Sequence, residues 1–433
     1  MGRANKVRQP KGLRQPKRWR KLDNAAKLFP PTSSRRNPRV FRFACELYEP
    51  VDPKALQEAL DKTIELFPVY RSVMKRGLFW YYLEESDLET TVSHEDSRPC
   101  APLYMGNKKN LLFSVTYHMC RINLEVYHVL SDGTGAIQFL RTLIIFYLQA
   151  KHNLPFDSDG VPDYNAAHSE RNNDSFQQYF SKELPEERKK LPQSYKIRGD
   201  RLPPGQMNIV EGLMSVAAVK AEAKARNTTV TEFLTAVLIM AIGEGVELSR
   251  RNRPITLSVP VNLRQFFISN SARNFFSVVN ISCYLEEKIV FDDILRQVRE
   301  CFEAELTEEK IRKRMNTFAS LEHNFAMKLL PLALKDPIMG AVARHADKRV
   351  TAALSNVGII DLPEEAAEYI RLIDSFTSTK GLHILLVSYR DSFIVNFASV
   401  FEDNDIQRRF FRHMTGLGID CEISSNWTDV KDY

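Results

Sequence analysis

The sequence lacks any cysteine pattern that would cross-link a fold or bind a metal. Its six cysteines are scattered, with no C-x-x-C pair and no histidine at ligand spacing. We therefore expect no disulfide framework, no zinc site and no other metal centre. Reduced thiols in a cytoplasmic protein are the expectation that follows.

Long hydrophobic runs and glycine-rich phosphate loops are also missing. The longest apolar stretch, 233–243, is far shorter than the roughly 20 residues that cross a bilayer. No apolar segment follows the N-terminal charges, so we expect no secretory signal. Neither G-x-G-x-x-G nor G-x-x-x-x-G-K-S/T occurs, and nucleotide hydrolysis is not indicated.

Positive charge is concentrated at one end of the chain. The sequence has 60 Lys and Arg against 54 Asp and Glu, a net charge of +6, but residues 1–21 hold nine basic residues and no acid. Without this segment the remaining 412 residues carry a net charge of −3. The segment could contact nucleic acid or an anionic membrane surface, but we expect it to be a solvated, disordered leader.

The rest of the chain mixes strands with amphipathic helices. From Val40 to Leu47 apolar and polar residues alternate, which predicts a half-buried strand, and Asp52 with Pro53 predicts the start of a helix that ends at Pro68. Similar patterns predict helices over 135–150, 175–187, 229–241 and 292–306 and from about 405. They predict strands over 69–74, 78–84, 111–117, 122–129, 255–261, 280–285, 350–357, 382–389 and 393–401.

A chain of 433 residues is too long for one small core and is typical of two packed domains. We predict a basic arm at 1–21, an N-terminal subdomain at 22–160, a linker at 161–205 and a C-terminal subdomain at 206–433. The order of elements fits the α/β class, as two α+β two-layer sandwiches that pack face to face with a channel between them.

The most informative segment is an H-x-x-x-D-G motif formed by His128, Asp132 and Gly133. Apolar residues at alternate positions before His128 place its imidazole on the inward face of a strand. Asp132 and Gly133 then predict a tight turn, with a Gly-x-Gly start that lets a helix approach closely. An imidazole with an ordinary pKa near 6.5 suits a general base. The alternative is a core histidine bonded to a carbonyl, followed by a plain turn.

This motif resembles the active-site motif of the superfamily that contains chloramphenicol acetyltransferase, peptide-synthetase condensation domains, wax ester synthases and alcohol acetyltransferases. The resemblance runs from about Trp19 to the C-terminus and favours the alcohol acetyltransferase-like branch. It includes four further stretches in the family's order: Leu22 to Pro30, Leu56 to Pro68, Ser258 to Arg264 and Ser355 to Gly358. The sequence departs from the family's pattern at two points: Tyr127 replaces the first of two adjacent histidines, and the plant-type D-F-G-W-G stretch is absent.

The resemblance implies two chloramphenicol acetyltransferase-like subdomains in a pseudo-dimer and direct acyl transfer from acyl-CoA, a co-substrate, with no permanently bound cofactor. His128 would take the proton of an alcohol. Asp132 would hold the histidine loop by pairing with an arginine, for which Arg264 is preferred over Arg273, and Gly133 completes this structural support. Ser355 and Asn356 are candidates for binding the oxyanion or the substrate.

Alternatives remain open at this stage. The acyl donor could be a carrier-protein thioester, the acceptor could be an amine, or the fold could be a non-catalytic binding protein. Of the other histidines, His118 and His383 lie in apolar strands and are expected to be core residues. The oligomeric state and the residues that would hold coenzyme A are not predicted.

Overall fold

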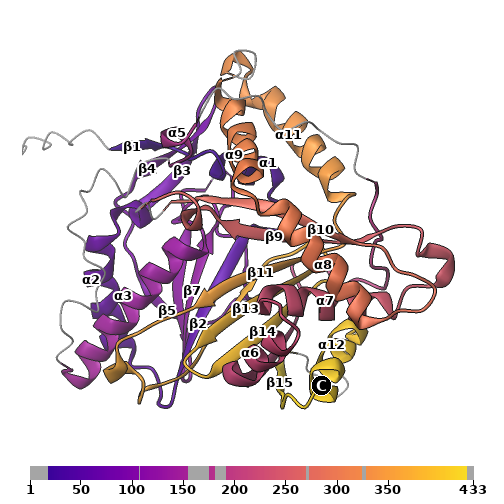
Figure 1. The fold of residues 1–433 in the computed structure, drawn as a ribbon. Coiled ribbons are helices and arrows are strands. Elements are labelled where there is room, and N and C mark those ends of the chain that lie inside the picture. Colours follow the sequence, from indigo (N-terminus) through magenta and orange to yellow (C-terminus); the bar gives the residue numbers. More distant parts are fainter. Residues whose placement is uncertain are drawn as a thin grey trace, which may run out of the picture.

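A computed structural model describes residues 18–106, 108–154, 175–180, 192–269, 273–323 and 328–426. Two large sheets, of five and seven strands, form the centre of the molecule, and helices cover them (Figure 1). The basic residues 1–17, most of the predicted linker at 161–205 and the end of the predicted helix near 187 lie outside the described residues. Within the described part, no helix is both long and apolar enough to span a membrane.

The five-stranded sheet has the order β12-β2-β7-β6-β5, and only the β5–β6 pair is parallel. In its central strand pair, Phe43 and Cys45 face the same side as Leu124 and Ile122. The prediction that β2 is half-buried was wrong, because Arg42 and Ala44 on its other face are buried too. The strands are β2 (Val40–Leu47), β5 (Val92–His94), β6 (Phe113–His118), β7 (Arg121–Tyr127) and β12 (Ile370–Thr377).

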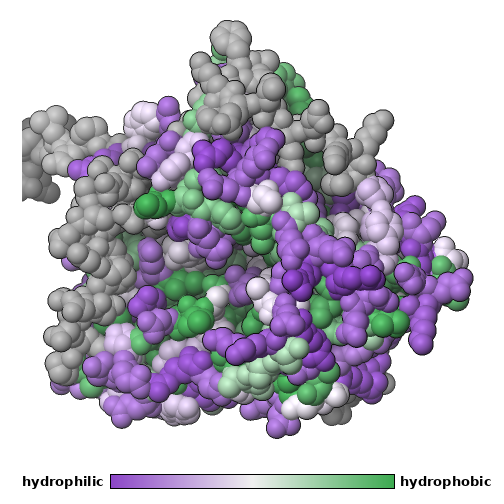
Figure 2. All heavy atoms as spheres, in the orientation of Figure 1, coloured by the Kyte–Doolittle hydropathy of each residue, from purple (hydrophilic) through white to green (hydrophobic). Residues whose placement is uncertain are grey.

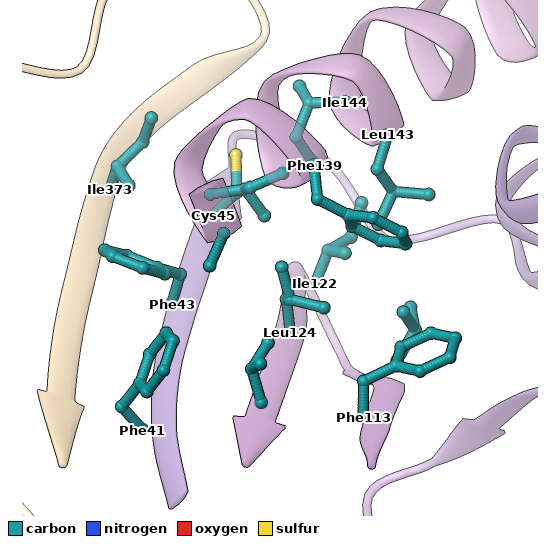
Figure 3. Close-up of a cluster of buried hydrophobic side chains, with 14 of the residues drawn as sticks. Phe41, Phe43, Cys45, Phe113, Ile122, Leu124, Phe139, Leu143, Ile144 and Ile373 are labelled. Carbon is teal, nitrogen blue, oxygen red and sulfur yellow. The ribbon is translucent and has the colours of Figure 1, made fainter. Parts of the chain in front are cut away.

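Helices α2 (Pro53–Leu66) and α3 (Gly133–His152) pack against each other over one face of this sheet. Figure 3 shows the side chains of Phe139, Leu143 and Ile144 on α3 above those of the strands. Asp52 caps α2 through the backbone N–H groups of the next turn, as its position before a proline indicates. Burying this apolar face fixes α3, and therefore the turn before it, on the sheet.

The seven-stranded sheet has the order β10-β9-β11-β13-β14-β8-β15. Its strands are β8 (Asn208–Ser215), β9 (Ile255–Asn262), β10 (Phe276–Cys283), β11 (Ala352–Ile359), β13 (Leu382–Tyr389), β14 (Ser392–Ser399) and β15 (Glu422–Ser425). The helices packed with it are α6 (Val216–Ala225), α7 (Val230–Gly243), α8 (Phe291–Glu305) and α12 (Asp405–Gly416).

A third sheet and three helices lie at the edge of the two large sheets (Figure 1). The sheet consists of β1 (Trp19–Lys21), β4 (Tyr81–Glu85) and β3 (Ser72–Arg76), in that order. The helices are α1 (Phe29–Thr32), α9 (Glu308–His323) and α11 (Leu332–Asp347), and α5 (Ser175–Gln178) contacts α9. Short 3₁₀ turns are at Ala26–Leu28, Pro68–Arg71, Leu248–Arg250, Leu263–Gln265 and Glu364–Ala366.

Three predictions about boundaries were wrong. The predicted C-terminal subdomain, 206–433, is not a separate unit, because β12 pairs with β2 in the sheet of the N-terminal half. The predicted arm, 1–21, is too long, because residues 19–21 form β1 and pair with β4. The predicted strand at 69–74 begins with a 3₁₀ turn, because Pro68 supplies a helical φ at its first position.

The faces of the two large sheets meet through a partly buried cluster of charged residues, in which Glu211 and Asp374 are buried. Arg121 of β7 lies 3.0 Å from the carboxylate of Glu46 on β2, 3.0 Å from that of Glu211 on β8 and 3.2 Å from that of Asp374 on β12. Asn396 of β14 donates to Asp374. Because the members come from both sheets, this cluster fixes how the two halves of the molecule sit on each other.

Candidate active site

His128 lies directly after β7, at the edge where strands of both halves come together. Its backbone N–H donates to the carbonyl of Arg39 at 2.9 Å, which continues the pairing of β7 with β2. Its own carbonyl accepts from Nδ2 of Asn274, in the C-terminal half, at 3.1 Å. The backbone of His128 is therefore held from both halves of the chain.

The imidazole of His128 lies among three aromatic rings. It stacks on Phe29 of α1 with centroids 4.8 Å apart and an interplanar angle of 17°, and it lies 4.5 Å from Phe41 of β2. Phe276 of β10 is 6.4 Å away on the other sheet. Nδ1 is a buried atom, yet the residue as a whole keeps part of its surface exposed. The ring is packed on its faces, and the residue is not among the fully buried ones.

The environment of His128 favours the neutral imidazole. Burial, with the nearby guanidinium of Arg39, lowers the pKa of His128 to about 3, and a backbone contact with Ser131 acts in the opposite direction. The ring is then uncharged at neutral pH and can accept a proton. Its basicity is low until a negative charge appears beside it.

A second histidine, which the sequence analysis assigned to the core, belongs to the same region. His383 of β13 lies with its Nε2 2.8 Å from Oγ of Ser355 on the neighbouring strand β11. Burial, together with electrostatic repulsion from His128 and Arg39, lowers the pKa of His383 to about 3. Two imidazoles, a guanidinium and a hydroxyl are thus gathered within electrostatic range of one another.

Ser355 and Asn356, the two predicted oxyanion or substrate residues, do not share a face of β11. Ser355 points to the side of His383, whereas Nδ2 of Asn356 donates to Oγ1 of Thr231 on α7 at 2.8 Å. Neighbouring residues of a strand point to opposite faces, so only one of the pair can reach the site. The structure brings Ser355 toward the imidazoles and leaves Asn356 on the helix side.

Asp132 joins three parts of the chain. Its Oδ1 accepts from the backbone N–H of Gly135 at 3.0 Å and caps α3, while its Oδ2 accepts from Nη1 of Arg264 at 2.8 Å and from the backbone N–H of Phe275 at 2.9 Å. Arg273, the competing partner, lies instead 3.5 Å from the carboxylate of Asp23. The carboxylate of Asp132 therefore ties the loop after His128 to the C-terminal half.

Gly133 is placed differently from the expectation of a tight turn. Asp132 is the N-cap and Gly133 is the first residue of α3. A Cβ at Gly133 would lie 4.0 Å from Cζ of Phe43, an ordinary van der Waals distance. The space around Gly133 therefore accommodates a side chain, and this position by itself does not require glycine.

Sequence reasoning missed three residues near His128: Arg39, Asn274 and His383. Each approaches through pairing between segments far apart in sequence, so local patterns carried no signal for them. No cluster of three or more His, Cys, Asp or Glu that could hold a metal occurs in the part of the chain that the structure describes.

Figure 2 shows one face of the molecule hollowed near its centre, with apolar residues on both sides, in the region between β7 and β11 of Figure 1. A continuous channel between the two halves stays a prediction. So does the role of Asp132, Gly133 and Arg264 as support for an active site.

No model of a known protein family matches the chain, and no curated protein sequence matches it. Solved structures do match. TRI101 of F. graminearum, complexed with coenzyme A and T-2 mycotoxin, is similar with a TM-score of 0.60 and 12% identity, over 93% of this chain and 99% of that chain. The TRI3 trichothecene 15-O-acetyltransferase of Fusarium sporotrichioides is similar with a TM-score of 0.56 and 13% identity, over 92% of this chain and 94% of that chain. The first condensation domain of the calcium-dependent antibiotic synthetase is similar with a TM-score of 0.58 and 16% identity, over 92% of this chain and 96% of that chain.

At these identities the likeness shows the fold. The chain has the α/β fold that condensation domains share with trichothecene acetyltransferases, which confirms the predicted fold class and the chloramphenicol acetyltransferase-like architecture.

Proposed function

We propose that the protein is an acyltransferase that moves an acyl group from coenzyme A to an alcohol, with His128 as general base. One observation carries the proposal: the neutral imidazole of His128, a partly exposed residue, lies where the two sheets meet. The fold supports it, because similar structures include a trichothecene 15-O-acetyltransferase and a protein complexed with coenzyme A. Acyl-CoA is then a co-substrate, and no resident cofactor is proposed.

The proposed reaction is direct transfer through one tetrahedral intermediate. The acceptor oxygen attacks the thioester carbonyl and forms the new C–O bond while His128 takes its proton. Collapse of the intermediate breaks the C–S bond, and the imidazolium returns the proton to the departing thiolate. Because Nδ1 is buried, Nε2 is the nitrogen that we assign to this proton. No acyl-enzyme is needed.

The low pKa of His128 is compatible with this mechanism. An imidazolium is unfavourable in the free site, but it forms in the reaction only when a negative oxygen forms beside it. Ser355 is our candidate donor to that oxyanion. If His383 donates its Nε2–H to Oγ of Ser355, the serine hydroxyl keeps its own proton for the substrate. Asn356 is not retained for this role, because its amide contacts Thr231.

Some expectations stay predictions. Condensation domains among the similar structures keep a carrier-protein donor or an amine acceptor open as a second function. A non-catalytic binding protein on the same fold is the third reading. The cytoplasmic location and the purpose of the basic residues at the N-terminus are likewise predicted only.

A panel of acyl-CoA thioesters, from acetyl to longer chains, tests the proposed reaction. Each is incubated with the protein and short alcohols or amines, and release of the free thiol is followed. We expect thiol release that depends on both the protein and an alcohol, with an ester product found by mass spectrometry. Release with amines alone would contradict the alcohol acceptor, and no acceptor-dependent release with any pair would contradict a coenzyme A-dependent transferase.

A further inference from the structure

Arg39 adopts an unusual backbone conformation directly beside the candidate base. Its φ is 60°, in the left-handed region that residues other than glycine rarely occupy. Its N–H donates to Oδ1 of Asn37 at 3.2 Å and its carbonyl accepts from the N–H of His128 at 2.9 Å. These bonds fix the start of the Arg39 side chain next to His128.

The guanidinium of Arg39 has no partner of opposite charge in contact with it. It makes no ion pair or hydrogen bond to the side chains or backbone that the structure describes, and its Nε is buried without a partner. Burial lowers the pKa of this guanidinium; the carboxylate of Asp347 attracts it from a distance, but that carboxylate pairs with Lys380. Arg42, three residues later, shows the usual arrangement, since Glu125 lies 2.7 Å and Glu95 2.5 Å from its Nη2.

Apart from the carboxylate of Asp347, which already pairs with Lys380, the groups near Arg39 are neutral or positive. Ser378 hydrogen-bonds to the backbone of Val40 in both directions, and the chain then turns into β13, which brings His383 to the same region. His383, with Ser355 bound to it, and His128 are within electrostatic range of Arg39. Arg39 is half-buried, and a cation withdrawn from water without a counter-charge in contact with it is destabilising. A protein that keeps one beside a reactive group has a use for it in ligand binding.

We infer that Arg39 binds the carboxylate of one of the two substrates, so that the protein acts on an anionic acyl donor or an anionic acceptor. The inference rests on the proposed function. The planar guanidinium offers two parallel N–H donors that match the two oxygens of a carboxylate. The phosphates of coenzyme A lie at the far end of the pantetheine arm from the thioester, so a group beside His128 belongs to the acyl chain or to the acceptor.

A bound carboxylate would also assist His128. The positive charge of Arg39 disfavours a second positive charge on the imidazole. An anion on Arg39 offsets that charge, so the substrate that fills the site makes His128 a better proton acceptor. Neutral substrates of the same shape lack this effect.

The test compares matched pairs of ligands that differ in one carboxylate. On the donor side we would titrate succinyl-CoA and butyryl-CoA, and on the acceptor side 3-hydroxybutyrate and 3-hydroxybutyramide, by calorimetry without turnover. The proteins are wild type, Arg39→Gln and the control Arg36→Gln, which removes an exposed arginine three residues away. We expect wild type to prefer the anionic member of one pair, which identifies the substrate that carries the carboxylate.

In Arg39→Gln that preference should fall by about 10- to 100-fold, the effect of losing a hydrogen bond to a charged group, while neutral ligands bind as before. Arg36→Gln should behave as wild type. Removing an uncompensated buried charge should also raise the melting temperature of Arg39→Gln. Equal binding of both members of each pair by wild type, or a charge preference that survives in Arg39→Gln, would overturn the inference.

Turnover separates this inference from the proposed function. Transfer of neutral substrates without any charge preference would leave the transferase standing and remove the anion site. Carboxylate binding that depends on Arg39, with no acyl transfer from any donor, would keep the anion site and remove the transferase.

Discussion

His128 combines two properties that usually conflict, burial and access. Phe29 and Phe41 cover the ring, which explains why its pKa is lowered to about 3, yet part of the residue is exposed. A neutral imidazole at this place avoids the free-energy cost of a buried charge, and it is protonated only when a negative charge forms beside it. Arg39 is the opposite case: its guanidinium is charged in the free protein, makes no ion pair, and is proposed to bind an anion.

At the residue scale, the sequence indicated some site residues and could not indicate others. His128 is recognisable because its motif is a short local pattern on a predicted strand. His383 has no such mark: it occupies one position of an apolar strand and becomes a site residue only because β13 lies beside β11. Arg39 likewise becomes a candidate site residue only because it lies opposite His128 at the end of the β2–β7 pair.

At the scale of elements, the turn before α3 depends on one carboxylate. Asp132 caps the helix, and it also accepts hydrogen bonds from the guanidinium of Arg264 and the backbone N–H of Phe275 in the other half of the chain. An ordinary N-cap makes only the first of these contacts. Asp52 is such a cap on α2, where it accepts from two backbone N–H groups.

Asp132→Asn should therefore cost much more stability than Asp52→Asn. The amide can still cap α3, but it leaves the partly buried Arg264 without its counter-charge, and we expect a loss of about 3–5 kcal/mol. Asp52→Asn keeps a good N-cap and should cost less than about 1 kcal/mol. Urea unfolding of both variants measures the difference. Similar losses would show that the Arg264 pair contributes nothing beyond a cap.

Elements with a regular apolar pattern were predictable. The predicted strand at 382–389 is confirmed as β13, and β2 is confirmed at Val40–Leu47. Strand β12 was not anticipated, because apolar and polar residues do not alternate regularly along its sequence. Its pairing with β2, more than 300 residues earlier, cannot be read from local sequence.

At the scale of the whole molecule, the two sheets are held by a cluster of charges as well as by apolar contacts. Arg121 neutralises carboxylates from both halves, and burial raises the pKa of Asp374 well above its usual range. The folded state therefore keeps a proton on this carboxyl to higher pH than the unfolded state does. Stability from that proton is present at low pH and is lost as pH rises through the folded-state pKa.

Arg121→Met should destabilise the protein in a pH-dependent way. At pH 8 we expect a loss of about 3–5 kcal/mol, because the pair with Glu211 is lost and the ionised carboxylate of Asp374 is left without its cation. At pH 5 the loss should be smaller, because protonation removes the stranded charge. Arg390→Met, which removes an exposed pair with Glu364, is the control and should cost less than about 1 kcal/mol at either pH. Urea unfolding at the two pH values measures the free energy of unfolding of each variant. An equal loss for Arg121→Met at both pH values would contradict a buried carboxyl pair.

The central claim is that the neutral imidazole of His128 accepts the proton of the attacking hydroxyl. Its most direct test is the rate of ester formation by His128→Gln and wild type at saturating acyl-CoA and alcohol, with circular dichroism spectra to show that both are folded. We expect kcat of His128→Gln to fall by about 100-fold or more while the spectra coincide. A variant that forms ester at the wild-type rate would contradict it.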